Sequence, residues 1–392
     1  MIPSSPLMAT YPTPLVTFVQ GEGSRLIDAD GSRYLDFLSG LAVTSLGHAR
    51  PEVVTAIASQ AETLSHVSNL FGNELAGPVA ALLDGLLADA TGTHGKVFFC
   101  NSGAEANECA IKLARRVSPG RHVVVSTLDS FHGRTLATLA ATGQPAKHAP
   151  FQPMPAGFVH VPFGDIGAVE TALEGGEVAA VLVECIQAEG GINVPERGYL
   201  SALESAARRV GALFMVDEIQ TGLGRTGSWF AFQDEALTPD VVTLAKALGN
   251  GMPVGACWAR DDVAAAFTPG DHGSTFGGQP LAMAAARATL ETMIDLDAPA
   301  LASRASAQLT AGLRDLEGVV DVRGRGLLLG AVLSQPVAVA ATAAALQAGL
   351  VVNAVRPDVI RLTPPLTVSA DEIDEAVMIL GSVLHEQMGA DG

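Results

Sequence analysis

An aspartate and a lysine, each at the end of a short apolar run, are the residues in this sequence best placed to do chemistry. Residues 212–216 form one such run and lead into Asp217, and residues 241–245 form another and lead into Lys246. If both runs are parallel strands joined by a crossover, the acid and the amine lie at the same carboxyl edge of one sheet, where open α/β folds bind ligands. We therefore expect Asp217 and Lys246 to share a cleft.

The setting of Lys246 differs from that of the other lysines. The chain has four lysines, and Lys96, Lys112 and Lys147 are predicted to be solvated surface residues. Lys246 is preceded by apolar residues and followed by a glycine-rich turn, and loss of solvent makes a lysine amine neutral and nucleophilic. An isolated lysine at such a position is more often an ordinary surface residue with a buried stem. The chemical interpretation therefore depends on the motifs that accompany it.

Composition and charge exclude several classes of protein. A chain of 392 residues with a formal charge of −18 has room for about two or three domains and is repelled by nucleic acids and anionic membranes. The four cysteines lack the spacing of a metal site or a disulfide framework, which favours a reducing compartment. The first residues lack the features of a signal peptide, and no apolar run is long enough to span a bilayer. We expect a soluble cytoplasmic protein.

The first part of the chain alternates between turn signals and short periodic segments. Residues 1–14 are rich in Pro, Ser and Thr and are predicted to form an extended arm. Three short runs bounded by turn residues predict an antiparallel meander, at residues 15–19, 25–28 and 33–37. Residues 51–65 and 73–90 have the spacing of amphipathic helices.

The remainder of the chain predicts an α/β fold with a smaller C-terminal part. From Lys96 to Lys246, runs that are apolar on both faces alternate with amphipathic segments, which indicates a mostly parallel sheet covered on both sides. A helix at 280–293 is followed by a loop that marks a plausible domain boundary. Strands are predicted near residues 319–322, 326–333 and 359–362. The last helix begins at Ser369, which forms a capping box with Glu372.

Several motifs lie at predicted strand ends. Ser102, Gly103 and Ala104 follow a strand and open a helix, a position where backbone N–H groups bind anions; alternatively, Ser102 and Glu105 simply cap that helix. In the loop after the next strand, Phe131 could stack on a planar group and Arg134 could bind a carboxylate. Taken alone, such a phenylalanine is more often part of the core and such an arginine is more often solvated.

Two further loops carry polar groups. Glu184 and Glu189 follow a strand, so one carboxylate could be structural while the other moves beside its glycines. Ser274 and Thr275 could bind a phosphate through their hydroxyls, or they could be turn residues.

The joint occurrence and order of these segments resemble the class III (subgroup II) pyridoxal-phosphate aminotransferases of fold type I. The resemblance extends from about Thr13 to the last helix, and its blocks are SGAEANE, FHGRT, VDEIQTGLGRTG, AKALGNGMPVGA, HGSTFGG, VRGRGLLLG and IRLTPPL. It implies a large cofactor-binding domain at 49–293, with a mostly parallel seven-stranded sheet. It also implies a smaller α+β domain at 294–392, against which an N-terminal arm and meander at 1–48 pack.

The resemblance implies a role for each cofactor-binding residue. Lys246 would bind pyridoxal 5'-phosphate covalently and then move the proton between substrate and cofactor. Asp217 would pair with the pyridine nitrogen, Gln220 with the phenolic oxygen, and Phe131 would stack on the ring. The phosphate would be held by Ser102, Gly103, Ala104, Ser274 and Thr275. Because Thr275 would come from the neighbouring subunit, the resemblance implies a homodimer with active sites at its interface.

The resemblance also implies how substrates bind. Arg134 would bind the distal carboxylate and Arg361 the α-carboxylate of 2-oxoglutarate, although Arg361 could instead form an ordinary structural ion pair. Glu189 would pair with Arg361 until 2-oxoglutarate displaces it. The implied reaction moves the δ-amino group of N2-acetyl-L-ornithine to 2-oxoglutarate, giving N-acetyl-L-glutamate 5-semialdehyde and L-glutamate in arginine biosynthesis.

Four positions depart from the family pattern. Cys185 and Ala188 replace a proline and a glycine, and Asn250 replaces a glycine. Leu41 stands where ornithine-using members carry a tyrosine, which favours an N-acylated donor or one without an α-amine. The alternatives are therefore 4-aminobutyrate, succinylornithine or succinyl-diaminopimelate as donor, an aminomutase, or a non-catalytic protein that binds the cofactor.

Overall fold

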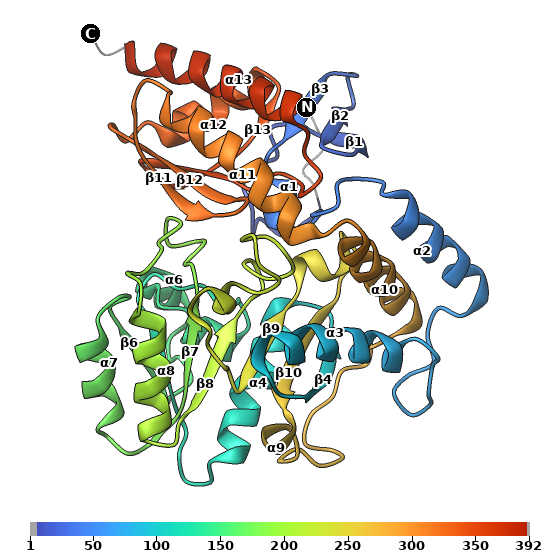
Figure 1. Cartoon of the computed structure of the whole chain (residues 1–392), viewed down its shortest axis with the longest axis vertical. Coiled ribbons are helices and arrows are strands. Elements are labelled where there is room, and N and C mark those ends of the chain that lie inside the picture. The colour runs from blue at the N-terminus through green and yellow to red at the C-terminus, as the bar shows by residue number, and fades with distance from the viewer. Residues whose placement is uncertain (1–5, 390–392) are drawn as a thin grey trace.

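The computed structural model describes residues 6–389, and a seven-stranded sheet forms the centre of its larger part (Figure 1). Its strands, in chain order, are β4 (Gly95–Cys100), β5 (Val123–Thr127), β6 (Phe158–Val161), β7 (Val178–Glu184), β8 (Leu213–Asp217), β9 (Val241–Leu244) and β10 (Gly255–Arg260). Their order across the sheet is β4-β10-β9-β8-β7-β5-β6. Strand β10 runs antiparallel to both of its neighbours, β4 and β9, and all other neighbouring strands are parallel to each other. The predicted mostly parallel sheet is confirmed.

Helices cover this sheet because its strands are apolar on both faces. Every residue of β7 and β8 is buried, which leaves no face for solvent. The helices and 3₁₀ turns of this part are α3 (Ala76–Thr91), α4 (Gly103–Val117), α5 (Leu136–Ala141), α6 (Pro145–His148), η1 (Ala149–Phe151), α7 (Ile166–Leu173), α8 (Tyr199–Arg209), η2 (Ala231–Glu235), η3 (Lys246–Gly249), α9 (Asp261–Ala264) and α10 (Pro280–Asp295). None of the helices within residues 6–389 is both long and apolar enough to cross a bilayer.

Two smaller four-stranded sheets lie at the other end of the molecule (Figure 1). The first contains β1 (Phe18–Glu22), β2 (Arg25–Asp28), β3 (Arg33–Asp36) and β13 (Leu350–Val351). The second contains β11 (Val319–Arg325), β12 (Leu328–Leu333), β15 (Val359–Leu362) and β14 (Asn353–Arg356). The helices of these two ends of the chain are α1 (Ser39–Ala42), α2 (Pro51–Thr63), α11 (Ala298–Arg314), α12 (Ala338–Gln347) and α13 (Ala370–Gly389). Since β13 pairs with β3, the N-terminal meander and the C-terminal region share a sheet.

Local signals placed most of these elements but not all of them. Strand β1 begins three residues later than predicted, since its pairing with β2 begins at Phe18, opposite Asp28. Strands β6, β10, β13 and β14 were not predicted. Ser369 and Glu372 form the predicted capping box. Residues 1–5 of the predicted arm lie outside the described residues, and the domain boundaries at 48/49 and 293/294 stay a prediction.

The loop that follows β8 is fixed by a buried arginine. Arg225 is 1% exposed and donates hydrogen bonds from Nη1 to the carbonyl oxygens of Leu327, at 3.1 Å, and Pro364, at 2.6 Å. Its Nη2 donates to Ser45 Oγ at 2.9 Å. One side chain therefore joins the loop that begins at Asp217 to the C-terminal sheet and to the segment after α1.

The same loop is supported by a buried carboxyl group, Glu218. Its Oε1 accepts a hydrogen bond from the backbone N–H of Phe232 at 3.0 Å, and its Oε2 accepts one from the hydroxyl of Thr221. Burial raises the pKa of Glu218 from 4.5 to about 7, although these hydrogen bonds oppose the rise. The hydrogen bonds from Phe232 and Thr221 therefore fix Glu218, which lies in the chain between Asp217 and Gln220.

Replacing Arg225 by methionine should destabilise the protein by about 3–5 kcal/mol, because several buried acceptors lose their donor at once. The measurement is the apparent free energy of unfolding in urea. R287M removes an arginine that is exposed on α10 and paired with Glu291, and it should change this value by less than about 0.5 kcal/mol. A loss in R225M no larger than the loss in R287M would contradict the role given to Arg225.

Replacing Glu218 by glutamine should remove part of the pH dependence of stability. The folded protein keeps the proton of Glu218 between pH 4.5 and about 7, whereas the unfolded chain releases it. Stability attributable to this group therefore falls as pH rises through that window, by roughly 3 kcal/mol. Unfolding free energies at the two ends of the window should differ less in E218Q than in the wild type. E62Q, on α2, should keep the wild-type dependence, and an unchanged slope in E218Q would refute the assignment.

Candidate active site

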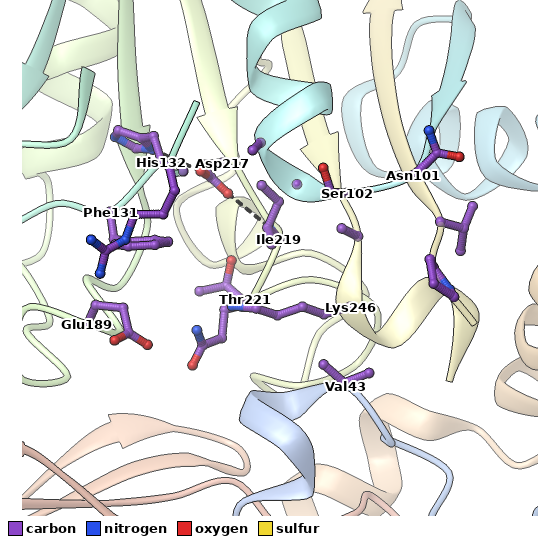
Figure 2. A pocket seen from close by; sticks show the side chains of 18 of the residues that line it. Val43, Asn101, Ser102, Phe131, His132, Glu189, Asp217, Ile219, Thr221 and Lys246 are labelled. Atoms are coloured by element: carbon purple, nitrogen blue, oxygen red, sulfur yellow. Dashed lines mark hydrogen bonds and ion pairs between the residues drawn. The ribbon is translucent and has the colours of Figure 1, made fainter. Parts of the chain in front are cut away.

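A cavity of about 380 Å³ opens where the carboxyl ends of β8 and β9 meet the loops after β4, β5 and β7 (Figure 2). Both Asp217 and Lys246 line it, so the structure brings the predicted acid and amine to one cavity. The site lies at the sheet edge that parallel strands make available to ligands.

Asp217 is a buried carboxylate with three hydrogen-bond donors. Its Oδ2 accepts a hydrogen bond from Asn107 Nδ2 at 2.8 Å and lies 2.8 Å from His132 Nδ1, while Oδ1 accepts one from the backbone N–H of Ile219 at 3.0 Å. These three contacts fix the orientation of the Asp217 side chain. Sequence reasoning missed both side-chain partners. They lie within the SGAEANE and FHGRT motifs, and that position was the available signal.

Lys246 begins the 3₁₀ turn η3 directly after β9 and has the left-handed φ of 44°. A non-glycine residue seldom adopts that conformation, and such strain is typical of functional sites. Burial lowers the pKa of Lys246 to about 8, although nearby carboxylates, Glu189 first among them, oppose the fall. A substantial fraction of the amine is therefore neutral near pH 8, as a nucleophile or proton acceptor requires.

The N-terminus of α4 forms one wall of the cavity. Ser102 caps the helix, since its Oγ accepts a hydrogen bond from the backbone N–H of Glu105, and Ser102, Gly103 and Ala104 all line the cavity. A Cβ on Gly103 would lie 2.7 Å from Ile219 Cδ1, so a larger residue there would force the side chain of Ile219 to move. The capping and anion-binding interpretations therefore apply to the same helix end.

Phe131 faces the cavity on the side away from Lys246 (Figure 2). Its backbone N–H donates to Glu184 Oε2 at 3.0 Å. Burial, followed by repulsion from Asp217, raises the pKa of Glu184 well above its usual value. Arg134 is exposed, lines the cavity, and has its Cζ 5.6 Å from the centre of the Phe131 ring.

Arg361 reaches the site from β15 in the smaller sheet. Its side chain is fully buried and donates to Glu189 Oε1, to Gln220 Oε1 at 3.0 Å, and to Asn353 Oδ1 at 3.1 Å. The attraction of Arg361 keeps the pKa of Glu189 low in spite of the larger opposing effect of burial. The predicted pairing of Arg361 with Glu189 is thus present, and Gln220 is held by the same guanidinium.

Ser274 and Thr275 lie apart from the other predicted site residues. Ser274 Oγ accepts a hydrogen bond from Nδ2 of the cavity residue Asn101 at 3.1 Å, but Ser274 does not line the cavity. Thr275 is exposed and lies next to Asn69, whose Nδ2 donates to the carbonyl oxygens of Ser274 and Gly277. Within one chain, therefore, the hydroxyl of Thr275 is not brought to the site.

Three of the side chains that depart from the family pattern pack outside the cavity. Asn250 has a left-handed φ of 45°, which asparagine tolerates, and its side chain bonds the backbone of Leu46 and Gly47 at 2.8 and 3.1 Å. Cys185 is buried with its Sγ 3.9 Å from Glu218 Oε1. Ala188 is buried in a small cluster with Ile186 and Ile192. None of these three side chains lines the cavity.

The arrangement can hold a planar, phosphate-bearing aromatic molecule with a basic ring nitrogen. The helix N-terminus suits the phosphate, the ring of Phe131 provides a stacking surface, and Asp217 can pair with a protonated nitrogen. Lys246 then stands where it can react with or deprotonate the group bound beside it.

Comparisons with known proteins agree with this geometry. The chain matches the model of the family described as aminotransferase class-III over residues 8–384. The acetylornithine aminotransferase of Corynebacterium efficiens is 49% identical over 385 residues, which cover 97% of this chain and 95% of that protein. The solved N-acetylornithine aminotransferase of Stenotrophomonas maltophilia has a TM-score of 0.84 at 36% identity, covering 97% of this chain and 98% of that one. The ornithine aminotransferase of Toxoplasma gondii, solved with partial occupancy of PLP at its active site, has a TM-score of 0.90 at 34% identity, covering 97% and 93%. This chain therefore belongs to the class III aminotransferases.

Proposed function

We propose that this enzyme transfers the δ-amino group of N2-acetyl-L-ornithine to 2-oxoglutarate, producing N-acetyl-L-glutamate 5-semialdehyde and L-glutamate in arginine biosynthesis. The observation that carries the proposal is the unequal state of two arginines, one that lines the cavity and one that contacts the lining residues Glu189 and Gln220. Arg361 is buried and already paired with Glu189, whereas Arg134 is exposed and forms no ion pair within residues 6–389. Arg134 can therefore bind a carboxylate directly, whereas Arg361 can bind one only when that carboxylate replaces Glu189.

The cofactor of the proposed reaction is pyridoxal 5'-phosphate, and the residues at the cavity fit it. Ser102, Gly103 and Ala104 would hold the phosphate, and Asp217 would pair with the ring nitrogen, with Phe131 against the ring. When bound, pyridoxal phosphate supplies the carbonyl that accepts the amino group and a conjugated ring that delocalises the electrons released at the substrate carbon.

The protein's own groups then orient the substrates and move the proton. Lys246 Nζ, with its pKa lowered to about 8, accepts a proton from one carbon and returns it to another. Asp217 is held in place by Asn107 and His132. Gln220, fixed by Arg361, would contact the phenolic oxygen of the cofactor.

Charge decides which substrate binds in each half of the reaction. The donor brings its δ-amine to Lys246 and places its α-carboxylate on Arg134, and no anion is needed near Arg361 because Glu189 already pairs with it. The keto acid has carboxylates at both ends, so it needs Arg134 and Arg361 together. Its α-carboxylate replaces Glu189 on Arg361.

The absence of a polar group at residue 41 supports an acylated donor. Leu41 is 37% exposed, and its neighbour Val43 lines the cavity. A free α-amino group would be charged and would find no acceptor on leucine, while an acyl group removes that charge.

A cytoplasmic homodimer is also part of the proposal. All four cysteines are free and buried, as in proteins of reducing compartments. Exposed apolar side chains lie in the segment after α2 and next to Thr275 in the chain, namely Leu64, Leu70, Phe71 and Phe276. Asn69 joins that segment to the backbone of Ser274 and Gly277, and the rings of His66 and Phe276 are 5.3 Å apart. We propose that a second copy covers this surface and receives Thr275 at its own phosphate site.

N2-acetyl-L-ornithine should bleach the visible absorbance of the cofactor-loaded enzyme, and 2-oxoglutarate should restore it. L-Ornithine should react more slowly by about tenfold or more, because its charged α-amine would lie beside Arg134 without an acceptor. Stopped-flow absorbance measures both half-reactions. K246M should lose at least about a thousandfold in rate. Faster bleaching by 4-aminobutyrate than by N2-acetyl-L-ornithine would show that the proposed donor is wrong.

Replacing Leu70 by aspartate should break the dimer and weaken retention of the cofactor, because a charge would be buried in the interface. Light scattering at matched concentrations gives the mass, and dialysis followed by absorbance gives the retained cofactor. V339D alters an equally apolar residue, 68% exposed on α12, and should remain a dimer. A dimeric L70D, or a monomeric wild type, would rule out this interface.

A further inference from the structure

Four cationic side chains contact residues of the cavity wall or their neighbours in the chain. Arg361 contacts Glu189, Arg356 Nε donates to the carbonyl oxygen of Gly190, and Arg134 and Lys147 lie against Phe131. Arg361 pairs with Glu189, and Arg356 Nη2 pairs with Asp129 Oδ1 at 2.7 Å. Within residues 6–389, neither Arg134 nor Lys147 forms an ion pair. Both instead lie against one aromatic ring, with Arg134 Cζ 5.6 Å and Lys147 Nζ 5.5 Å from the centre of Phe131.

The prediction that Lys147 is a solvated surface residue is wrong. Lys147 is half-buried, and its Nζ donates to Gln144 Oε1, while Gln144 Nε2 donates to the carbonyl oxygen of Ser130 at 2.9 Å. The sequence signal was misleading because Pro145 suggested an exposed loop, whereas that proline begins the short helix α6. The turn therefore holds Lys147 over the loop that carries Phe131.

Backbone contacts fix the turn that precedes Lys147. The N–H of Gly143 donates to Ser130 Oγ at 3.0 Å, and its carbonyl oxygen accepts from the N–H of Asp129 at 2.8 Å. A Cβ on Gly143 would lie 2.0 Å from the carbonyl oxygen of Thr127, so only glycine permits this approach. Lys147 is thus attached to the same rigid strand end, β5, as Phe131 and Arg134.

Lys147 and Glu189 act on each other electrostatically. Burial lowers the pKa of Lys147, repulsion from Arg134 lowers it further, and attraction by Glu189 opposes both. In turn, Lys147 is among the cations that favour the charged form of Glu189. Glu189 has 28% of its side chain exposed and is followed by Gly190 and Gly191, the latter with a φ of 118°. Glu189 and Phe131 line the same cavity and lie side by side in Figure 2, and Lys147 lies against the ring of Phe131.

A count of charges shows why a second partner for Glu189 is needed, and this step rests on the proposed function. When a dicarboxylic keto acid binds, its two carboxylates occupy Arg361 and Arg134. Glu189 is then displaced from a largely buried position, and an unpaired buried carboxylate is costly. Arg356 is already paired with Asp129, and Lys246 is engaged in the chemistry. Lys147 is the remaining cation of this group.

We propose that Lys147 is a positioning residue that receives the Glu189 carboxylate when a dicarboxylic keto acid takes its place on Arg361. Lys147 thereby stabilises the form of the enzyme that binds the amino acceptor, and it contributes little to the form that binds the amino donor.

The test separates the two half-reactions in wild type, K147M and K147R. Enzyme loaded with pyridoxamine phosphate is mixed with 2-oxoglutarate, and enzyme loaded with pyridoxal phosphate is mixed with N2-acetyl-L-ornithine. In K147M, kcat/KM for the first reaction should fall by about tenfold, while that for the second should change by less than about twofold. K147R keeps the charge and should recover most of the loss. K96M removes an exposed lysine at the start of β4, the end of the strand away from the cavity, where Lys96 pairs with Asp261. This variant should change neither reaction.

Each other outcome overturns the proposal. An equal loss of kcat/KM in both half-reactions would indicate that Lys147 contacts both substrates or has a structural role. A larger loss with N2-acetyl-L-ornithine would indicate that Lys147 contacts the acyl group of the donor. No change in either reaction would mean that Glu189 does not need this cation. Because the acceptor reaction starts from supplied pyridoxamine phosphate, a failure of N2-acetyl-L-ornithine as donor leaves this test intact. If the wild type itself fails to react with 2-oxoglutarate, the proposed acceptor and the role of Lys147 both fall.

Discussion

The buried guanidinium of Arg361 is the interaction on which the arrangement of this site depends. It extends from β15 in the smaller sheet, has no exposed surface, and bonds Gln220 and Glu189, which belong to loops after β8 and β7 of the larger sheet. Removing the carboxylate of Glu189 alone, or the guanidinium of Arg361 alone, would leave the other charge unpaired, at a cost of several kcal/mol. The two sheets are therefore held at one separation by an electrostatic requirement as well as by apolar packing.

The parts of the site that the sequence predicts best are those that depend on strand ends. Asp217 and Lys246 each follow an apolar run, and parallel strands bring their carboxyl ends to one edge without any further information. Ser102 was predicted for a similar reason, since a capping residue after a strand marks a helix N-terminus. The fold follows from the same pattern, because runs apolar on both faces fit a covered parallel sheet.

Residues that act through contacts between distant segments were not predictable in this way. Asn107 lies on the buried face of α4 and His132 in a loop, and only the folded chain shows that both meet the same oxygen of Asp217. Arg225 looks like a polar loop residue until its three acceptors are brought around it. Lys147 was misjudged for the same reason, since its burial comes from β5 and its loop. Periodicity describes one segment at a time, so it carries no information on such pairs.

The buried state of Arg361 also determines the order of events in the proposed reaction. If Glu189 left before another carboxylate arrived, the buried guanidinium would keep only its neutral partners Gln220 and Asn353, and leaving a buried charge without a counter-charge is costly. The exchange is therefore a replacement of one anion by another, and a keto acid without a distal carboxylate would also forgo the contact with Arg134. A cavity whose backbone is fixed can thus accept two unlike substrates. Between the two substrates, only the partner of Arg361 and the position of the Glu189 carboxylate change.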